Sequence, residues 1–374
     1  MTEINLPIGV NPNTYLTYHH NGKLEQNRKL KAENFDWNLK HPKSLAYILD
    51  NIKNDIFWKI CYKSKWNDTP EVAESKYWIN IFMERYYADI LENLNPRHYD
   101  PEKIKKIVKL CGPYIQSLSI RSLIPSDIPV QRNVSPEMSE LITTNREGST
   151  NCNVSPIDHI SLHAALGSLT NLTELHITYQ LIFIGIEYRK DQFQFTNNDA
   201  KNLSCGLGKC TQLKTLSHCK IADHGASSIA KFISKHDKLK NLILVDNLFG
   251  PDGIESISQV LNNTSCGLRT LDLRLNNRLG SEGIAHVAVS IARGCNLISL
   301  NISGCGINSK PLHKPPAGVW SAMNAENPPT CGDLLARAIG LVKTPLRSLD
   351  ISVNDIGTVC CKTIKMSVSI LHTW

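Results

Sequence analysis

The sequence contains no long apolar segment, which excludes the classes of protein that need one. No apolar run approaches the length of about 20 residues that a membrane-spanning helix requires. The first residues, Met1 to Pro12, contain neither a basic stretch nor an apolar core, so they do not form a secretory signal. We therefore expect an intracellular, soluble protein without membrane insertion.

The sequence also lacks a dense cluster of basic residues. Lys and Arg number 41 against 34 Asp and Glu, and this surplus of +7 is spread along the chain without a basic block. A dispersed surplus is typical of solvated surface and predicts no nucleic-acid partner. Hydrophobic residues make up 41% of the 374 residues, which excludes a mainly disordered chain.

Motifs for catalysis and cofactor binding are absent or incomplete. The segment 205–210 contains two glycines and a lysine but lacks the spacing of a phosphate-binding loop. His159 and His163 have helical spacing, but a zinc site needs further ligands. Cys360 and Cys361 are adjacent, and the twelve cysteines are interpreted as reduced, mostly buried thiols. We expect a non-enzymatic protein with no catalytic residue, metal, cofactor or small-molecule substrate.

The strongest feature is a repeated pattern, L-x-x-L-x-L-x-x-N, in the second half of the chain. Copies begin at Leu239, Leu268, Leu297 and Leu346, with a degenerate copy at Leu172. The alternating leucines predict a short strand with apolar side chains on one face, and the residues that follow have helical spacing. A period of about 29 residues with one helix per repeat predicts an α/β fold, a ribonuclease-inhibitor-like leucine-rich repeat solenoid. Its parallel strands would line the concave face and its helices the convex face.

In three of these copies the last position of the pattern, which we call the closing position, is an asparagine. Asn247, Asn276 and Asn354 follow the strand, where the chain turns away from its neighbours. We expect their amides to bond backbone groups that have no partner in the sheet, and a cysteine thiol at the same position to do so weakly.

Two copies depart from the regular spacing. The copy at Leu213 is two residues short, either as a compressed repeat or through a small deletion. The interval from Leu297 to Leu346 exceeds one repeat by about 21 residues, which matches the Pro-rich segment 313–333. We interpret this segment either as an exposed loop on the convex side or as sequence included by mistake.

The remaining chain suggests four regions. Residues 1–35 are polar and predict a mobile arm, residues 36–125 a helical pre-repeat region, and residues 126–155 a linker or loop. The leucine-rich repeat array spans 156–374, with its insert at 313–333. The array stops at its C-terminal end without a polar cap, so we expect either a partner that covers this end or a truncated form.

Three helices are predicted in the pre-repeat region. Apolar periodicity marks residues 43–62 and 71–95, and Asp100 followed by Pro101 marks the start of the third. A strand-like segment, 115–120, then leads into the array.

The candidate binding surface is the concave face of the sheet, because solenoids use such surfaces for recognition. The side chains between buried leucines point outward there. They are Ile243, Val245, Asp272, Arg274, Asn301, Ser303, Asp350 and Ser352. The pattern fits a partner footprint, and it also fits an ordinary solvated sheet face.

The residues ahead of the repeats resemble one known family. The resemblance lies in the order of residues 78–85, 100–101, 110–111, 114–115 and 123–125, then 172–175 and the non-repeat segment 180–196. This order is similar to that in the T-complex-associated testis-expressed protein 1 family, also called dynein regulatory complex subunit 5. The resemblance covers about residues 75–310. It implies a structural docking subunit of the nexin–dynein regulatory complex in the axonemes of motile cilia and flagella. Its implied partners are other subunits of that complex, and its implied role is in dynein-driven motility, including that of sperm.

Two alternatives remain at this point. Activators of a small GTPase use the same repeat class, but their acidic C-terminal tail is absent here. Innate-immune receptors also carry such repeats, but a fragment of one would be supported by a nucleotide-binding loop that this sequence lacks.

Overall fold

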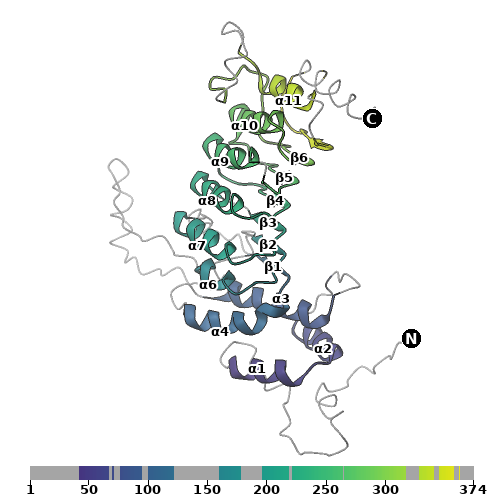
Figure 1. Ribbon diagram of the computed structural model, residues 1–374. Helices are drawn as coiled ribbons and strands as arrows, with labels where there is room; N and C mark the ends of the chain where they lie inside the picture. The colour runs from purple at the N-terminus through teal and green to yellow at the C-terminus, as the bar shows by residue number, and fades with distance from the viewer. Residues whose placement is uncertain are drawn as a thin grey trace, which may run out of the picture.

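The computed structural model describes residues 42–66, 70, 76–94, 100–121, 160–177, 196–218, 221–263, 265–316, 328–340, 345–357 and 362. Within these residues a parallel sheet of seven strands runs in the order β1 to β7. A row of helices follows one side of the sheet from end to end (Figure 1). The fold is therefore the α/β leucine-rich repeat solenoid that the sequence predicts.

The strands are β1 (Ser117–Ile120), β2 (Glu174–Ile177), β3 (Thr215–His218), β4 (Asn241–Ile243), β5 (Thr270–Asp272), β6 (Ser299–Asn301) and β7 (Ser348–Asp350). The helices are α1 (Pro42–Asn51), α2 (Asp55–Lys65), α3 (Trp78–Asn93), α4 (Pro101–Cys111), the short 3-10 helix η4 (Gly112–Tyr114), α6 (Leu162–Leu166), α7 (Asn197–Leu207), α8 (Asp223–Ile233), α9 (Pro251–Leu261), α10 (Gly280–Ala292) and α11 (Cys331–Gly340).

The register of the sheet follows the leucine pattern. The same leucine position pairs across neighbouring strands, as in Leu242 with Leu271 and Leu271 with Leu300. These three side chains are at most 1% exposed. Because a strand alternates its side chains between two faces, aligning one leucine aligns every inward and outward position of the repeat.

A chain of buried asparagine hydrogen bonds joins the repeats at the strand exits. The Oδ1 atom of Asn276 accepts from the backbone N–H of Asn247 at 2.8 Å, and its Nδ2 atom donates to the carbonyl of Leu244 at 2.6 Å. Asn247 in turn accepts from the N–H of Ile221 at 2.8 Å. Each amide thus satisfies backbone groups of the preceding repeat, which confirms the role predicted for this position.

The same position is occupied differently near the C-terminal end. Asn354 accepts from the N–H of Cys305 at 3.0 Å and donates to the carbonyl of Ile302 at 2.8 Å. In the copy between them, the thiol of Cys305 donates to the carbonyl of Leu273 at 3.0 Å. A thiol donates more weakly than an amide, so the side-chain bond between the β5 and β6 repeats is weaker than the bonds that Asn354 makes between the β6 and β7 repeats.

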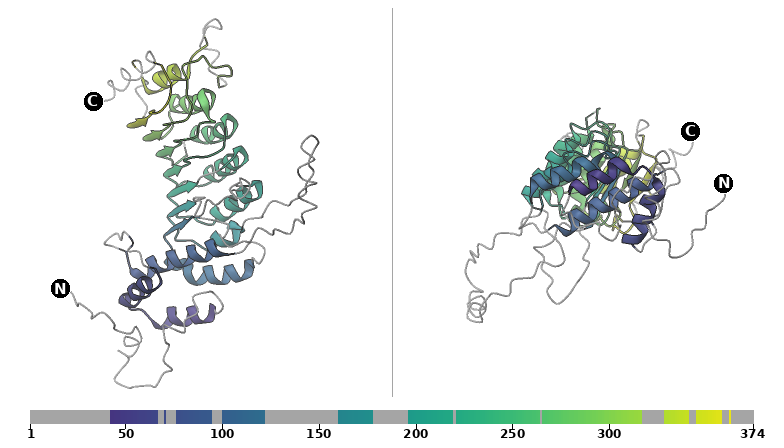
Figure 2. Two further views of the ribbon diagram at one scale, coloured as in Figure 1. Left: turned by 180° about the vertical axis from the view of Figure 1, so that it is seen from behind. Right: turned by 90° about the horizontal axis from the view of Figure 1, so that it is seen from below.

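Helix α3 covers the first edge of the sheet. Glu84 accepts from the backbone N–H groups of Gln116 and Ser117 at 3.0 and 2.9 Å, and Glu92 accepts from that of Arg121 at 2.7 Å. These N–H groups belong to β1 and the residues beside it, which have no preceding strand to bond. Two carboxylates on one helix therefore replace the missing strand, as an edge strand requires. Figure 2 shows these N-terminal helices lying across the end of the array.

The segment predicted as one helix at 43–62 is divided in the structure. Helix α1 ends at Asn51 and α2 begins at Asp55. The Oδ1 atom of Asn54 accepts from the N–H of Ile56 at 2.9 Å, so Asn54 caps a new helix. Apolar periodicity continues through such a break and therefore did not reveal it. Asp100 does cap α4, as predicted, with Pro101 at its first position.

The two irregular repeats still fit the sheet. Strand β3, in the short repeat, pairs with both β2 and β4. In the long repeat the chain leaves and returns at one place, where the N–H of Leu312 donates to the carbonyl of Pro329 at 3.0 Å. Thr330 and Asp333 then form reciprocal hydrogen bonds at the start of α11. Residues 331–333, which the sequence interpretation assigned to the insert, form the first turn of this helix.

Several predicted features lie outside the described residues. They are the arm at 1–35, the linker at 126–155, most of the segment 180–196, His159, and the adjacent pair Cys360 and Cys361. In the part of the chain that the structure describes, no helix is long and apolar enough to cross a bilayer.

We expect the substitution Asn276→Ala to lower the free energy of unfolding by about 3 kcal/mol, because it leaves several buried backbone groups without partners. The measurement is the urea midpoint followed by circular dichroism. The neighbouring Asn277→Ala, at an exposed position, is the matched control and should change the midpoint little. Equal effects of the two substitutions would contradict the role assigned to the buried amide.

Candidate binding surface

The structure brings the eight predicted surface residues together in two adjacent columns. Ile243 pairs with Asp272, Asp272 with Asn301, and Asn301 with Asp350 across strands β4 to β7. The second column lies two residues further along each chain, at the strand exits. Its members are Val245, Arg274, Ser303 and Ser352.

Three members of the first column hold the backbone as well as facing outward. The side-chain oxygens of Asp272, Asn301 and Asp350 accept from the N–H of the residue two positions later, at 3.1, 3.0 and 3.0 Å. This is the Asx turn, in which a short polar side chain substitutes for a backbone acceptor. The polar column thus has a structural use that the sequence analysis did not assign to it.

The remaining polar atoms bond along the surface. The Nε atom of Arg274 lies 3.3 Å from Oδ2 of Asp272, and the Nδ2 atom of Asn301 donates to Oδ2 of Asp350 at 3.2 Å. Hydrogen bonds from Ser352 and Asn301, with Arg274 nearby, hold the pKa of the Asp350 carboxyl below its usual range. The surface at β5 to β7 is therefore an ordered polar patch with an ionised carboxylate, beside the apolar Ile243 and Val245.

A row of left-handed residues borders this patch, and the sequence analysis missed it. The residue before each closing position has a positive φ: 53° at Asp246, 63° at Leu275, 64° at Gly304 and 56° at Val353. Leu275 and Val353 are 56% and 81% exposed. An exposed apolar side chain in a strained conformation is unusual away from functional surfaces. The signal was an apolar residue directly before the closing asparagine.

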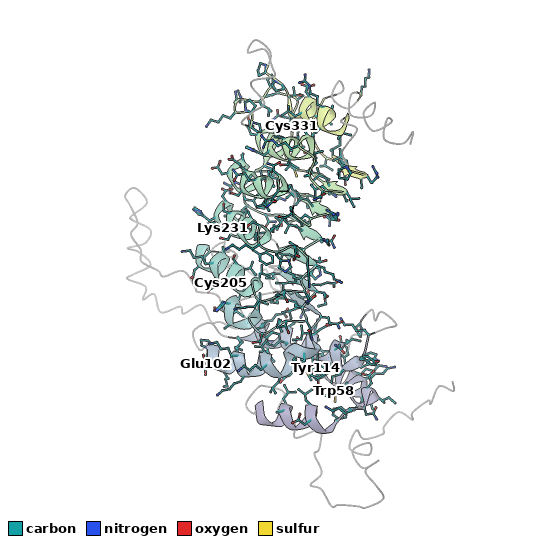
Figure 3. The ribbon with its side chains drawn as sticks, in the orientation of Figure 1. Trp58, Glu102, Tyr114, Cys205, Lys231 and Cys331 are labelled. Carbon is teal, nitrogen blue, oxygen red and sulfur yellow. The ribbon has the colours of Figure 1, made fainter. Side chains whose placement is uncertain are left out.

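The described side chains give little support for a metal site or a phosphate-binding loop. No group of three or more His, Cys, Asp or Glu residues there is placed to hold a metal ion. Cys205 lies in α7 and Cys210 follows it, so the glycine-containing segment between them is a helix end rather than a phosphate loop. Cys205 and Lys231 lie on the helix layer, away from the strands (Figure 3).

We expect Val353→Asn to raise the free energy of unfolding by about 1 kcal/mol, because asparagine tolerates the left-handed region better than a β-branched residue. The urea midpoint measures the change. Ser348→Asn, at an exposed position in β7 of the same repeat, has no positive φ to relieve and should give no gain. A loss of stability in Val353→Asn would show that the conformation at this residue is not strained.

Cysteine alkylation should separate exposed from buried thiols. Burial raises the pKa of Cys61, Cys111, Cys210 and Cys305 to about 12, so at pH 8 only about one molecule in 10,000 carries the thiolate at each site. Iodoacetamide should therefore modify Cys205, which is exposed, and leave these four intact in the folded chain. Peptide mass mapping measures this, with the guanidinium-unfolded protein as the control in which all five react.

A comparison with family models agrees with this architecture. A family model described as "Leucine Rich repeat" matches residues 264–288, which include β5 and much of α10. A solved structure of the yeast Rad7 and Elc1 complex covers 72% of this chain and 51% of its own, with a TM-score of 0.38 and 13% identity.

Comparison with curated proteins gives a more specific similarity than the repeat family model does. Dynein regulatory complex subunit 5 of Macaca fascicularis is 26% identical over 258 residues, which are 68% of this chain and 50% of the relative. The Homo sapiens protein of that name is 26% identical over 218 residues, 58% of this chain and 42% of the relative. The chain thus spans about half the length of the curated relatives that it matches. The chain has the fold of a leucine-rich repeat protein and is similar in sequence to dynein regulatory complex subunit 5.

Proposed function

We propose that this protein is a non-enzymatic docking subunit of the nexin–dynein regulatory complex in motile cilia and flagella. The observation that carries the proposal is the similarity to dynein regulatory complex subunit 5 over 258 residues. That length exceeds the region 156–374, so it includes part of the chain ahead of the array as well as the repeats. Repeats alone are shared by many families, and the added segment favours this one.

The proposed contact with neighbouring subunits is the concave patch. We give this name to the two columns of surface residues described above, which are Ile243, Val245, Asp272, Arg274, Asn301, Ser303, Asp350 and Ser352. Its carboxylates and amides are already held by Asx turns, so little side-chain freedom is lost when a partner binds. Leu275 and Val353 add exposed apolar area at its border. A rigid polar patch with apolar groups beside it suits a protein partner, because interfaces combine these two components.

The test is localisation of tagged full-length protein in a ciliated cell, followed by removal of the membrane with detergent. We expect the protein to remain along the axoneme. A diffuse signal that is fully extracted would contradict the proposed function.

A pair of double variants then tests the surface. Ser303→Arg with Ser352→Arg adds bulk to the concave patch without removing the carboxylates and amides that form the Asx turns, and should abolish most axonemal retention. Gln259→Arg with Ala292→Arg adds the same charge to exposed positions on α9 and α10 and should retain it. Retention of both double variants would leave the docking role intact and reject the concave patch as its contact.

A further inference from the structure

A second surface lies at the opposite end of the strands, where the chain enters the sheet. The position after the leucine that begins each repeat is Lys214 before β3, Lys240 before β4, Arg269 before β5 and Arg347 before β7. The copy before β6 has Ile298 instead, which is 42% exposed. Four of five consecutive repeats therefore carry a cation at one position.

The backbone stacks these five residues directly on one another. The N–H of Lys240 donates to the carbonyl of Lys214 at 2.8 Å, and the N–H of Arg269 donates to that of Lys240 at 2.8 Å. The same bond joins Ile298 to Arg269 and Arg347 to Ile298, each at 2.7 Å. Neighbouring members are thus about 4.8 Å apart along the sheet edge, the spacing of adjacent strands.

Further lysines flank the stack and little negative charge opposes it. Lys209, Lys235 and Lys238 are exposed in the turns that lead into β3 and β4. In the described residues of the turns that lead into β3 to β7, Asp237 is the single acidic residue. We call Lys209, Lys214, Lys235, Lys238, Lys240, Arg269 and Arg347 the basic edge.

Helix-end electrostatics explain only part of this arrangement. Cations are favoured near the C-terminal end of a helix, which accounts for Lys209 after α7 and Lys235 after α8. The four stacked cations lie later, at the starts of the strands. Burial raises the pKa of the nearby Cys266 thiol, and Arg269 and Lys240 oppose that rise, so both charges act on the same part of the edge.

Arg269 is positioned for recognition of carboxylates. Its Nη1 group donates to the carbonyls of Leu268 at 3.2 Å and Asn296 at 3.3 Å, which fixes the plane of the guanidinium. These bonds use two of its five N–H donors. A fixed guanidinium with remaining donors suits the paired oxygens of a carboxylate.

We propose that the basic edge binds an acidic segment of a protein partner, with carboxylates on the stacked cations and an apolar residue on Ile298. Two observations favour a polypeptide over nucleic acid. Ile298 interrupts the cations with an exposed apolar side chain, and the described turns of this edge contain no Phe, Tyr or Trp on which a base would stack. The surface is distinct from the concave patch, so the inference does not depend on the proposed function.

The test uses the full chain and a fluorescein-labelled peptide of glutamates with one central leucine, followed by fluorescence anisotropy. We expect binding that weakens as the salt concentration rises, because ions screen exposed charges. The triple variant Lys214→Gln, Lys240→Gln and Arg347→Gln should bind about tenfold more weakly, since each exposed contact contributes only a fraction of the affinity. Ile298→Ala should weaken this peptide but not an all-glutamate peptide.

The matched control removes the same charge elsewhere. Lys103→Gln, Lys106→Gln and Lys109→Gln lie on the exposed face of α4 and should leave the affinity unchanged. Circular dichroism confirms that each variant is folded. An equal loss in the control variant, tighter binding of a single-stranded oligonucleotide of the same charge, or no binding of the peptide at low salt would each overturn the proposal.

Discussion

The regular geometry of this solenoid depends on the asparagines at the exits of β4, β5 and β7, which are Asn247, Asn276 and Asn354. Strands of three or four residues supply few backbone bonds, and the chain then turns sharply toward the helix layer. Asn276 holds that turn by bonding the backbone of the previous repeat on both its oxygen and its nitrogen. This change of direction requires a left-handed backbone conformation at the residue just before the asparagine. Leu275 and Val353 occupy that position and therefore lie at the border of the concave face. A constraint inside the core thereby decides which side chains are exposed outside it.

The N-terminal edge of the sheet is covered by the protein's own helix α3. At the N-terminal end, Glu84 and Glu92 of α3 supply acceptors for the edge of the first strand. The edge is thus paired before any partner binds, and helix α3, which supplies the carboxylates, belongs to the same continuous core as the repeats. This gives the pre-repeat helices a physical task in the solenoid, because an unpaired edge is prone to association with other strands.

The two ends of the strands present surfaces of different chemistry. The strand exits carry carboxylates and amides held in Asx turns, with apolar residues beside them, and the strand entries carry stacked cations. Both patterns arise because one repeat position is copied along a parallel sheet, so a single preference in sequence becomes a continuous stripe in space. The concave patch and the basic edge therefore lie at opposite ends of the same strands, and two partners can bind them at the same time.

The sequence by itself determined the repeat, the strand positions and the inward leucines, since local alternation and a fixed period are enough to specify them. It also predicted the role of Asn247 and Asn276, because a polar residue at a strand exit has few other uses. It did not reveal the break at Asn54, since apolar spacing continues through it, or the left-handed conformation of Val353. Nor did it reveal the basic edge: Lys214, Lys240, Arg269 and Arg347 are dispersed along the chain, and the surplus charge looked evenly spread. Only the stacking of parallel strands brings them together, because neighbours across a sheet are a whole repeat or more apart in sequence.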